Sequence, residues 1–360
     1  MPKERREYAL ERGRTGARGV AILASGYIGC FMAHARKTED CLKGLSRLGH
    51  DPSAPAARAE IGQYLAHKSN AVVAKAAKLA GDFELHDLRP QLVEAFHRFM
   101  KDPAVSDRGC SAKAAIVRAL EALAAPEEAI YLAGIRHIQM EGSYGPPIDT
   151  AAALRSASAM GLVHMHHPDA VLHLVTLLVD READARIGAV RALASSGRPE
   201  VVPLLRLKVL AGDESVDVIA ECFTALLAVA PARSLDFVAG YLDGGAGVAE
   251  AAALSLGQSR EPAALDILKN RYAAGAGESL RRALLAGLAL AREDSAYEFL
   301  FSLVETAPEK MAGEALAALA VYRHDDRIRS RVMALVVNRK GKLLQQLLAA
   351  EFGLTTPLKP

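Results

Sequence analysis

The chain has 360 residues and a formal net charge of +2, and 51% of its residues are hydrophobic although only 5% are aromatic and Trp is absent. Ala and Leu, the strongest helix formers, dominate the hydrophobic residues, while the β-branched and aromatic residues that favour strands are few. This composition indicates an all-helical protein. The near-neutral middle of the chain argues against the broad basic stripe that is typical of nucleic-acid binding.

Residues 1–40 form a basic and apolar N-terminal segment with an uncharged run over residues 20–33. That run is too short to span a bilayer as a helix, which needs about 20 residues. Its small residues recur every four positions, which favours a capping helix, although the run also fits the apolar region of a secretory signal. Ile28-Gly29-Cys30 resembles the end of a bacterial lipoprotein cleavage box. We expect a cytoplasmic protein, with a cell-envelope location through a signal ending at Cys30 as the alternative.

One helix-ending pattern recurs within residues 41–352: an apolar run that closes on Ala-Leu or a near equivalent. The closing residues are Leu79, Leu123, Met160, Leu193, Leu226, Leu256, Leu288 and Leu319. Their spacing converges on about 32 residues, which is typical of a protein built from stacked structural repeats. Residues 353–360 follow as a C-terminal tail, and the basic stretch over 323–342 is expected to be a terminal cap or a docking site.

Each repeat contains two helical stretches, a first (A) and a second (B) helix. Within residues 168–197, Pro168 marks the start of the A helix, and apolar residues then recur at helical spacing. Asp184 is placed to cap the B helix and Gly197 to end it. The pattern therefore predicts antiparallel helix pairs with short connections.

Alignment of the B helices on their closing residues separates two columns. The residue three positions before each closing residue is always apolar, which predicts a buried column. Two positions earlier the helix has turned by about 200°. That column, Ala74, Arg118, Arg155, Gly188, Glu221, Ala251, Ala283 and Glu314, is predicted to be exposed. We expect Arg118, Arg155 and Glu221 to contact a partner there.

The phrases DARIGAVRALASSGRPEVVPLLRLKVL and ESLRRALLAGLALAREDSAYEFLFSLV resemble the short HEAT repeats called phycobilin-lyase-type repeats. The resemblance covers about residues 55–335, and the chain as a whole resembles bacterial HEAT-repeat proteins. It implies an all-α fold, a right-handed α-solenoid (superhelix) of about eight HEAT-like helix pairs. Such repeats occur in scaffolds, adaptors and a few enzymes.

The segment 140–149 interrupts the regular array, because its Gly and Pro residues exclude a helix. Insertions in repeat proteins are loops that often lie on the binding face. Tyr144 is therefore a candidate partner contact, together with Arg136 and His137 before the loop. A tolerated surface loop without function is the alternative.

Candidate metal ligands gather in one place, at a turn between helices, where His164, His166 and His167 precede Asp169 and His173. Zinc sites usually have better separated ligand pairs, so we interpret these as exposed turn histidines and predict no metal and no cofactor. The cysteines, Cys30, Cys41, Cys110 and Cys222, are far apart and are expected to be reduced, mostly buried thiols.

The sequence favours a non-enzymatic scaffold or adaptor that binds another protein along its exposed B-helix face, with no catalytic residue. An enzyme or enzyme subunit of the phycobilin-lyase type is the alternative that the resemblance implies. A nucleic-acid-binding HEAT-like protein is the second alternative. Without Trp and without a central basic stripe, we expect no nucleic acid as partner.

Overall fold

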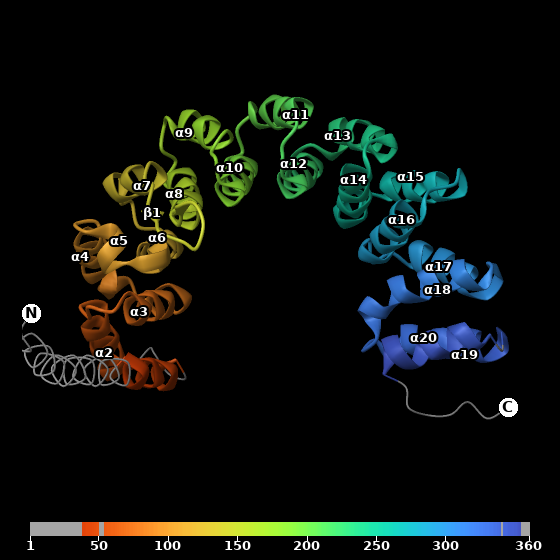
Figure 1. Ribbon diagram of the computed structural model, residues 1–360, viewed down its shortest axis with the longest axis horizontal. Helices are drawn as coiled ribbons and strands as arrows, with labels where there is room; N and C mark the ends of the chain where they lie inside the picture. Colours follow the sequence, from red (N-terminus) through yellow and green to blue (C-terminus); the bar gives the residue numbers. More distant parts are fainter. Residues whose placement is uncertain (1–37, 50–53, 340, 354–360) are drawn as a thin grey trace, which may run out of the picture. The chain divides into compact units, whose positions relative to one another are not determined.

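The computed structural model describes residues 38–49, 54–339 and 341–353, and most of them are helical (Figure 1). The chain divides into two compact units: unit 1 ends at His167, and unit 2 begins at Pro168. The predictions for the run that contains Cys30 and for the tail after Gly353 lie outside the described residues. In both units the predicted all-α fold of repeated helix pairs is confirmed.

Unit 1 contains three helix pairs whose A and B members form separate layers (Figure 1). The A helices are α2 (Pro55–Leu65), α4 (Arg89–Phe99) and α7 (Glu128–Ile135), and the B helices are α3 (Asn70–Asp82), α6 (Ser111–Ala122) and α8 (Ala152–His164). In the B layer, α3 packs on α6 and α6 packs on α8. A helix over residues 38–48 precedes these pairs. The short elements are η2 (His86–Leu88), α5 (Pro103–Ser106), η3 (Arg108–Cys110), β1 (Met140–Glu141) and β2 (Ile148–Asp149).

Unit 2 continues the same pattern with six pairs. Its A helices are α9 (Ala170–Leu177), α11 (Val201–Ala211), α13 (Pro231–Ala239), α15 (Pro262–Ala273), α17 (Asp294–Thr306) and α19 (Asp326–Arg339). Its B helices are α10 (Ala183–Ser195), α12 (Val216–Val229), α14 (Ala246–Ser259), α16 (Glu278–Leu290), α18 (Glu309–Leu319) and α20 (Lys342–Phe352), with the short η4 (Gly240–Asp243) and η5 (Ala320–Tyr322). The described residues thus hold nine pairs, one more than predicted. The basic C-terminal stretch is the additional pair, with α19 on α17 and α20 on α18.

Proline and glycine set many of the helix ends. Pro231 and Pro262 occupy the first positions of α13 and α15, where the missing N–H has no helical partner to lose. Gly197, just after α10, has the left-handed φ of +64° that the prediction required. The prediction that Asp184 caps the B helix was wrong, because α10 begins at Ala183 and Asp184 lies within its first turn. There the carboxylate interacts favourably with the positive end of the helix dipole.

The B helices of unit 2 approach each other closely because small residues lie between them. A Cβ atom at Gly257 of α14 would be only 2.0 Å from the carbonyl oxygen of Gly287 in α16. The predicted core column is confirmed, because every residue three positions before a closing residue is buried: Ala76, Leu120, Ala157, Val190, Phe223, Ala253, Leu285 and Leu316. This column therefore belongs to the core in both units.

Two arginines with little exposed surface, Arg186 and Arg281, join successive repeats in unit 2. Arg186 of α10 donates to the carbonyl oxygen of Asp180 and, over 2.7 Å, to Asp213 in the next connection. Burial alone raises the pKa of Asp213, but hydrogen bonds from Arg186 and Lys208 outweigh it and lower the pKa to about 2. In α16, Arg281 holds both carboxylate oxygens of Glu314 in α18 at 2.5 and 2.6 Å. Such two-pronged pairs fix the register between repeats.

Among the described residues, no helix combines the length and the apolar character needed to cross a membrane.

Candidate partner-binding surface

A groove of about 800 Å³ lies between α3 and α6 on the B layer of unit 1. Six of its lining residues are small: Ala71, Ala74, Gly81, Ala115, Ala119 and Ala122. The two helices nearly touch at one point, because a Cβ atom at Gly81 would lie 3.0 Å from the Cα atom of Ala119. The remaining lining residues are polar or charged: Lys75, Lys78, Asp82, Ser111 and Arg118. We call this the α3–α6 groove.

The charges of the α3–α6 groove are not balanced. Lys78 pairs with Asp82 at 2.7 Å. Lys75 donates instead to two neutral oxygens, the carbonyl oxygen of Leu42 at 3.0 Å and the Ser46 hydroxyl. Arg118 is exposed, and no described residue forms an ion pair or hydrogen bond with it. Two of the three cations are therefore available to a bound anion. The prediction that Arg118 is exposed on the B layer is confirmed.

A buried polar network holds the N-terminal end of α6, next to the groove. The Asp107 carboxylate accepts from the backbone N–H groups of Ala112 and Lys113, each at 2.9 Å. It also pairs with the Lys113 ammonium group at 3.0 Å, and both side chains are 0% exposed. Asn70 of α3 donates to Asp107 and to the carbonyl oxygen of Arg108. The network thus ties the N-terminal ends of α3 and α6 together and fixes one end of the groove.

The predicted insertion is a β-hairpin that is anchored on this network. Strands β1 and β2 pair antiparallel, with Glu141 opposite Ile148. Glu141 accepts hydrogen bonds from the Gly109 N–H, the Gln139 amide and the Thr150 hydroxyl. Burial raises the pKa of Glu141, but these bonds outweigh it and lower the pKa. The absence of helix over 140–149 was predicted correctly, whereas the strand pair was not.

The hairpin carries a cluster of exposed apolar side chains: Ile138, Met140, Tyr144 and Ile148. Tyr144 is fully exposed at the tip. Arg136 is exposed just after α7, as the prediction of a contact residue requires. His137 is half-buried and hydrogen-bonds to Gln139 at 3.3 Å, and burial lowers its pKa. The hairpin therefore presents Tyr144 and Arg136, while His137 belongs to its base.

The prediction that Arg155 contacts a partner was wrong about its position, because the side chain is 2% exposed. Arg155 donates to the carbonyl oxygen of His137 at 2.8 Å and to the Asp149 carboxylate at 2.7 Å. It therefore joins the two ends of the hairpin. Position 155 belongs to the column five residues before the closing residue, and other members of that column, such as Ala251 and Ala283, are buried as well.

The predicted exposed column also fails in unit 2, where Gly188, Ala251, Ala283 and Glu314 are buried. Neighbouring B helices pack on each other and cover that side. Glu221 is half-buried and pairs with Arg191 at 2.8 Å. One residue earlier, which is a turn of 100°, Ile187, Ala220 and Glu250 are half-buried and Arg282 is exposed.

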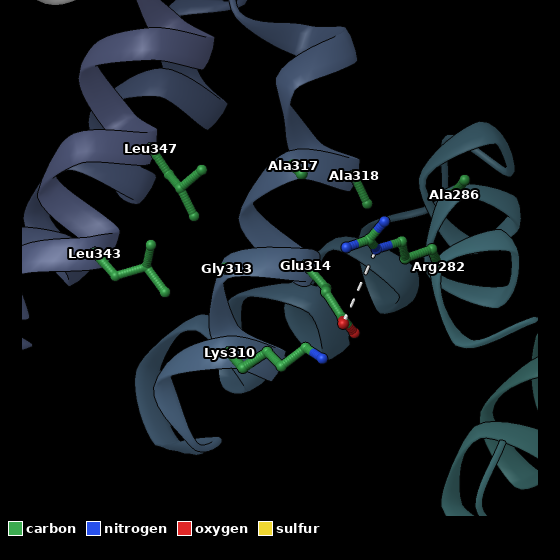
Figure 2. Close-up of a pocket in the computed structure, with 9 residues that line it drawn as sticks. All are labelled: Arg282, Ala286, Lys310, Gly313, Glu314, Ala317, Ala318, Leu343 and Leu347. Atoms are coloured by element: carbon green, nitrogen blue, oxygen red, sulfur yellow. Dashed lines mark ion pairs between the residues drawn. The ribbon is translucent and has the colours of Figure 1, made fainter. Parts of the chain in front are cut away.

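Unit 2 has its own B-layer groove, lined by α16, α18 and α20, with a volume of about 480 Å³ (Figure 2). A second hollow of about 490 Å³ between α14 and α16 shares Arg282 and Ala286 with it. We call the two together the α14–α20 groove. In Figure 2, Leu343 and Leu347 of α20 lie on one side of α18, and Arg282 approaches Glu314 from the other.

The cations of the α14–α20 groove are paired within the protein. Glu278 forms ion pairs with Arg282, at 2.7 Å, and with Lys310. Glu314 is held by Arg281 and lies 4.0 Å from Arg282. This groove therefore offers small and aliphatic surface with its cations already satisfied.

The histidines of the predicted turn do not form a cluster of metal ligands. His164 is exposed and pairs with Glu121 at 2.7 Å. His167, expected to be exposed, is only 8% exposed, and its Nε2 lies 3.4 Å from the carboxylate of Glu128 in α7. Among the described residues, no group of three or more His, Cys, Asp or Glu side chains is arranged to hold a metal ion.

The described cysteines are free thiols. Cys110 and Cys222 are buried and Cys41 is half-buried. Burial raises the pKa of Cys110 and of Cys222 to about 12, so both thiols are protonated at neutral pH.

Comparison with known proteins gives likenesses to solved structures alone. One is the complex of CpcE and CpcF of the phycocyanin lyase from a Nostoc species, with 19% identity and a TM-score of 0.34 over 69% of this chain and 92% of that chain. Another is an engineered protein, with 15% identity and a TM-score of 0.33 over 87% of this chain and 95% of that chain. No family model and no curated protein matches the sequence.

Proposed function

We propose that the protein is a non-enzymatic scaffold that binds another protein along its B layer, with the α3–α6 groove as the principal contact. The observation that carries the proposal is Arg118, an exposed cation without a partner among the described residues, at a groove lined by small side chains. Arg is enriched at protein interfaces, where its guanidinium forms several hydrogen bonds at once. A groove with small side chains lets a partner approach the helix backbones closely.

The hairpin of unit 1 supports the same proposal. Its four exposed apolar side chains lie on a hairpin whose base is held by hydrogen bonds, so few further groups would lose conformational freedom when a partner binds. Side-by-side B helices also give an extended surface of the kind that repeat proteins use for binding. We further propose that the protein binds its partner in the cytoplasm.

The proposal is tested by purifying the tagged full-length chain from its source organism and treating it with a lysine-reactive cross-linker. Mass spectrometry then maps the cross-links to the partner. We expect a stoichiometric partner whose cross-links fall on Lys75 and Lys78 of the groove. Lys101 and Lys269, which lie on or next to A helices, serve as internal controls.

Two results would contradict the proposal. One is the absence of any stoichiometric partner. The other is a partner whose cross-links fall on Lys101 and Lys269 and spare the groove, which would place binding on the A layer.

A further inference from the structure

We infer that the α3–α6 groove binds an acidic segment of the partner protein. This inference rests on the proposed function and specifies the chemistry of its ligand. The groove has three cations, Lys75, Lys78 and Arg118, against the single carboxylate of Asp82. Because Asp82 is engaged by Lys78, the excess positive charge resides on Lys75 and Arg118.

The two excess cations project from adjacent helices. Lys75 lies on α3, and its ammonium group bonds only neutral oxygens among the described residues. Arg118 lies on α6 and is exposed. Carboxylates of one segment that follows the groove can therefore reach both cations. Hydrogen bonds between ionised partners are stronger than neutral ones, so two such contacts provide both affinity and selectivity for negative charge.

The rest of the lining favours a polypeptide over a nucleic acid. Ala and Gly side chains leave room for the backbone and small side chains of a peptide segment. None of the described groove-lining residues is aromatic, and non-specific binding of single strands relies on stacking of bases against aromatic rings. Two excess cations are also few for a backbone that carries one charge per phosphate.

The other hollows of the B layer lack this charge. In the α14–α20 groove, Arg282 and Lys310 both pair with Glu278. An acidic segment would have to displace Glu278 to use these cations. The selectivity for acidic segments therefore belongs to unit 1.

The test is a selection of random peptides displayed on phage against the full-length chain, repeated against the Arg118→Glu variant. Arg331→Glu is the matched control, because Arg331 is exposed on α19, outside the groove, and the charge change is identical. Circular dichroism verifies that all three proteins are folded. We expect enriched peptides rich in Asp and Glu on the wild type and on Arg331→Glu, but not on Arg118→Glu.

An enriched peptide is then titrated by fluorescence anisotropy. We expect Lys75→Glu and Arg118→Glu each to weaken binding about tenfold or more, the loss of one charge-assisted contact. Binding should also weaken as salt increases. Tighter binding of single-stranded DNA than of the acidic peptide, with the same dependence on Arg118, would replace the inference by a nucleic-acid site.

The inference is overturned if no peptide is enriched, if the enriched peptides are neutral or basic, or if Arg118→Glu enriches the same peptides as the wild type. If the peptide selection fails but a stoichiometric partner is cross-linked to the B layer, the scaffold proposal stands. If neither acidic peptides nor a cross-linked partner is found, the scaffold proposal is contradicted as well.

Discussion

The B layers of the two units share their construction but differ in how their charges are used. In unit 1, Arg118 and Lys75 line a groove, and neither of these two cations has a carboxylate partner among the described residues. In unit 2, Glu278 and Glu314 satisfy the basic side chains of the α14–α20 groove. Paired charges at a contact between repeats contribute to the fold, whereas unpaired charges are available to a ligand. The position of a carboxylate therefore decides whether a basic side chain of the B layer stabilises the contact between repeats or is available to a ligand.

The largest expected effect is on a paired charge in unit 2. Replacement of Glu314 by Ala leaves the Arg281 guanidinium, itself largely buried, without its carboxylate. We expect the free energy of unfolding to fall by about 3–5 kcal/mol, measured by urea denaturation. The control is Glu278→Ala, which removes an exposed partner and should leave the free energy of unfolding close to that of the wild type. Equal effects of the two variants would contradict the assignment of Glu314 to the fold.

The next effect tests how closely the B helices pack in each unit. In Gly257→Ala the new methyl group would lie 2.0 Å from a backbone oxygen of α16, which cannot move without displacing the helix. We expect a loss of about 3 kcal/mol in the free energy of unfolding. Gly81→Ala in unit 1 meets Ala119 at 3.0 Å and should cost less. If Gly81→Ala were the more damaging variant, the closer approach would be in unit 1.

A smaller effect on the free energy of unfolding is expected at acidic pH. The pKa of Asp213 is lowered from 3.8 to about 2 in the folded protein. Its contribution is therefore fully present above about pH 4 and is lost as the pH falls from 4 toward 2. We expect Asp213→Asn to remove about 2 kcal/mol of stability at pH 7 and to flatten the dependence on pH in that window. Thermal denaturation of both proteins at pH 3 and pH 7 gives the comparison, and an unchanged pH dependence would contradict it.

The smallest expected effect on stability is that of Arg118→Ala. Because no described residue pairs with Arg118, we expect a change within about 0.5 kcal/mol in the free energy of unfolding. Urea denaturation of the variant and the wild type measures it. A loss of more than about 1 kcal/mol would show that Arg118 supports the fold and is not free for a ligand.

The repeat pattern was sufficient to predict the fold. Apolar spacing identified the helix pairs, and the buried column from Ala76 to Leu316 was predicted at every position. The pair α19–α20 was missed as a repeat because its basic residues suggested only a cap or a docking site. Arg339, for instance, donates to the carbonyl oxygens of Val304 and Ala307, so its charge secures α19 to the preceding pair.

The candidate site could be predicted only in part, because the sequence does not show which side of each B helix its neighbours cover. The exposure of Arg118 was predicted correctly, whereas that of Arg155 was not, since its column is buried there as it is at Ala251 and Ala283. The network of Asp107 and Gln139 was missed because its members are 32 residues apart, and local periodicity carries no information on such pairs. The available local signal for this network was Asp107, which lies four residues before Ser111, the first residue of α6.

The most direct test of the central claim compares one cation from each unit. Arg118→Glu and Arg282→Glu make the same charge change on the two B layers, and the affinity of a selected acidic peptide is measured by fluorescence anisotropy for both. We predict that Arg118→Glu weakens binding about tenfold or more and that Arg282→Glu changes it less than about twofold. Equal losses in the two variants, or a larger loss in Arg282→Glu, would contradict the claim that unit 1 holds the binding groove.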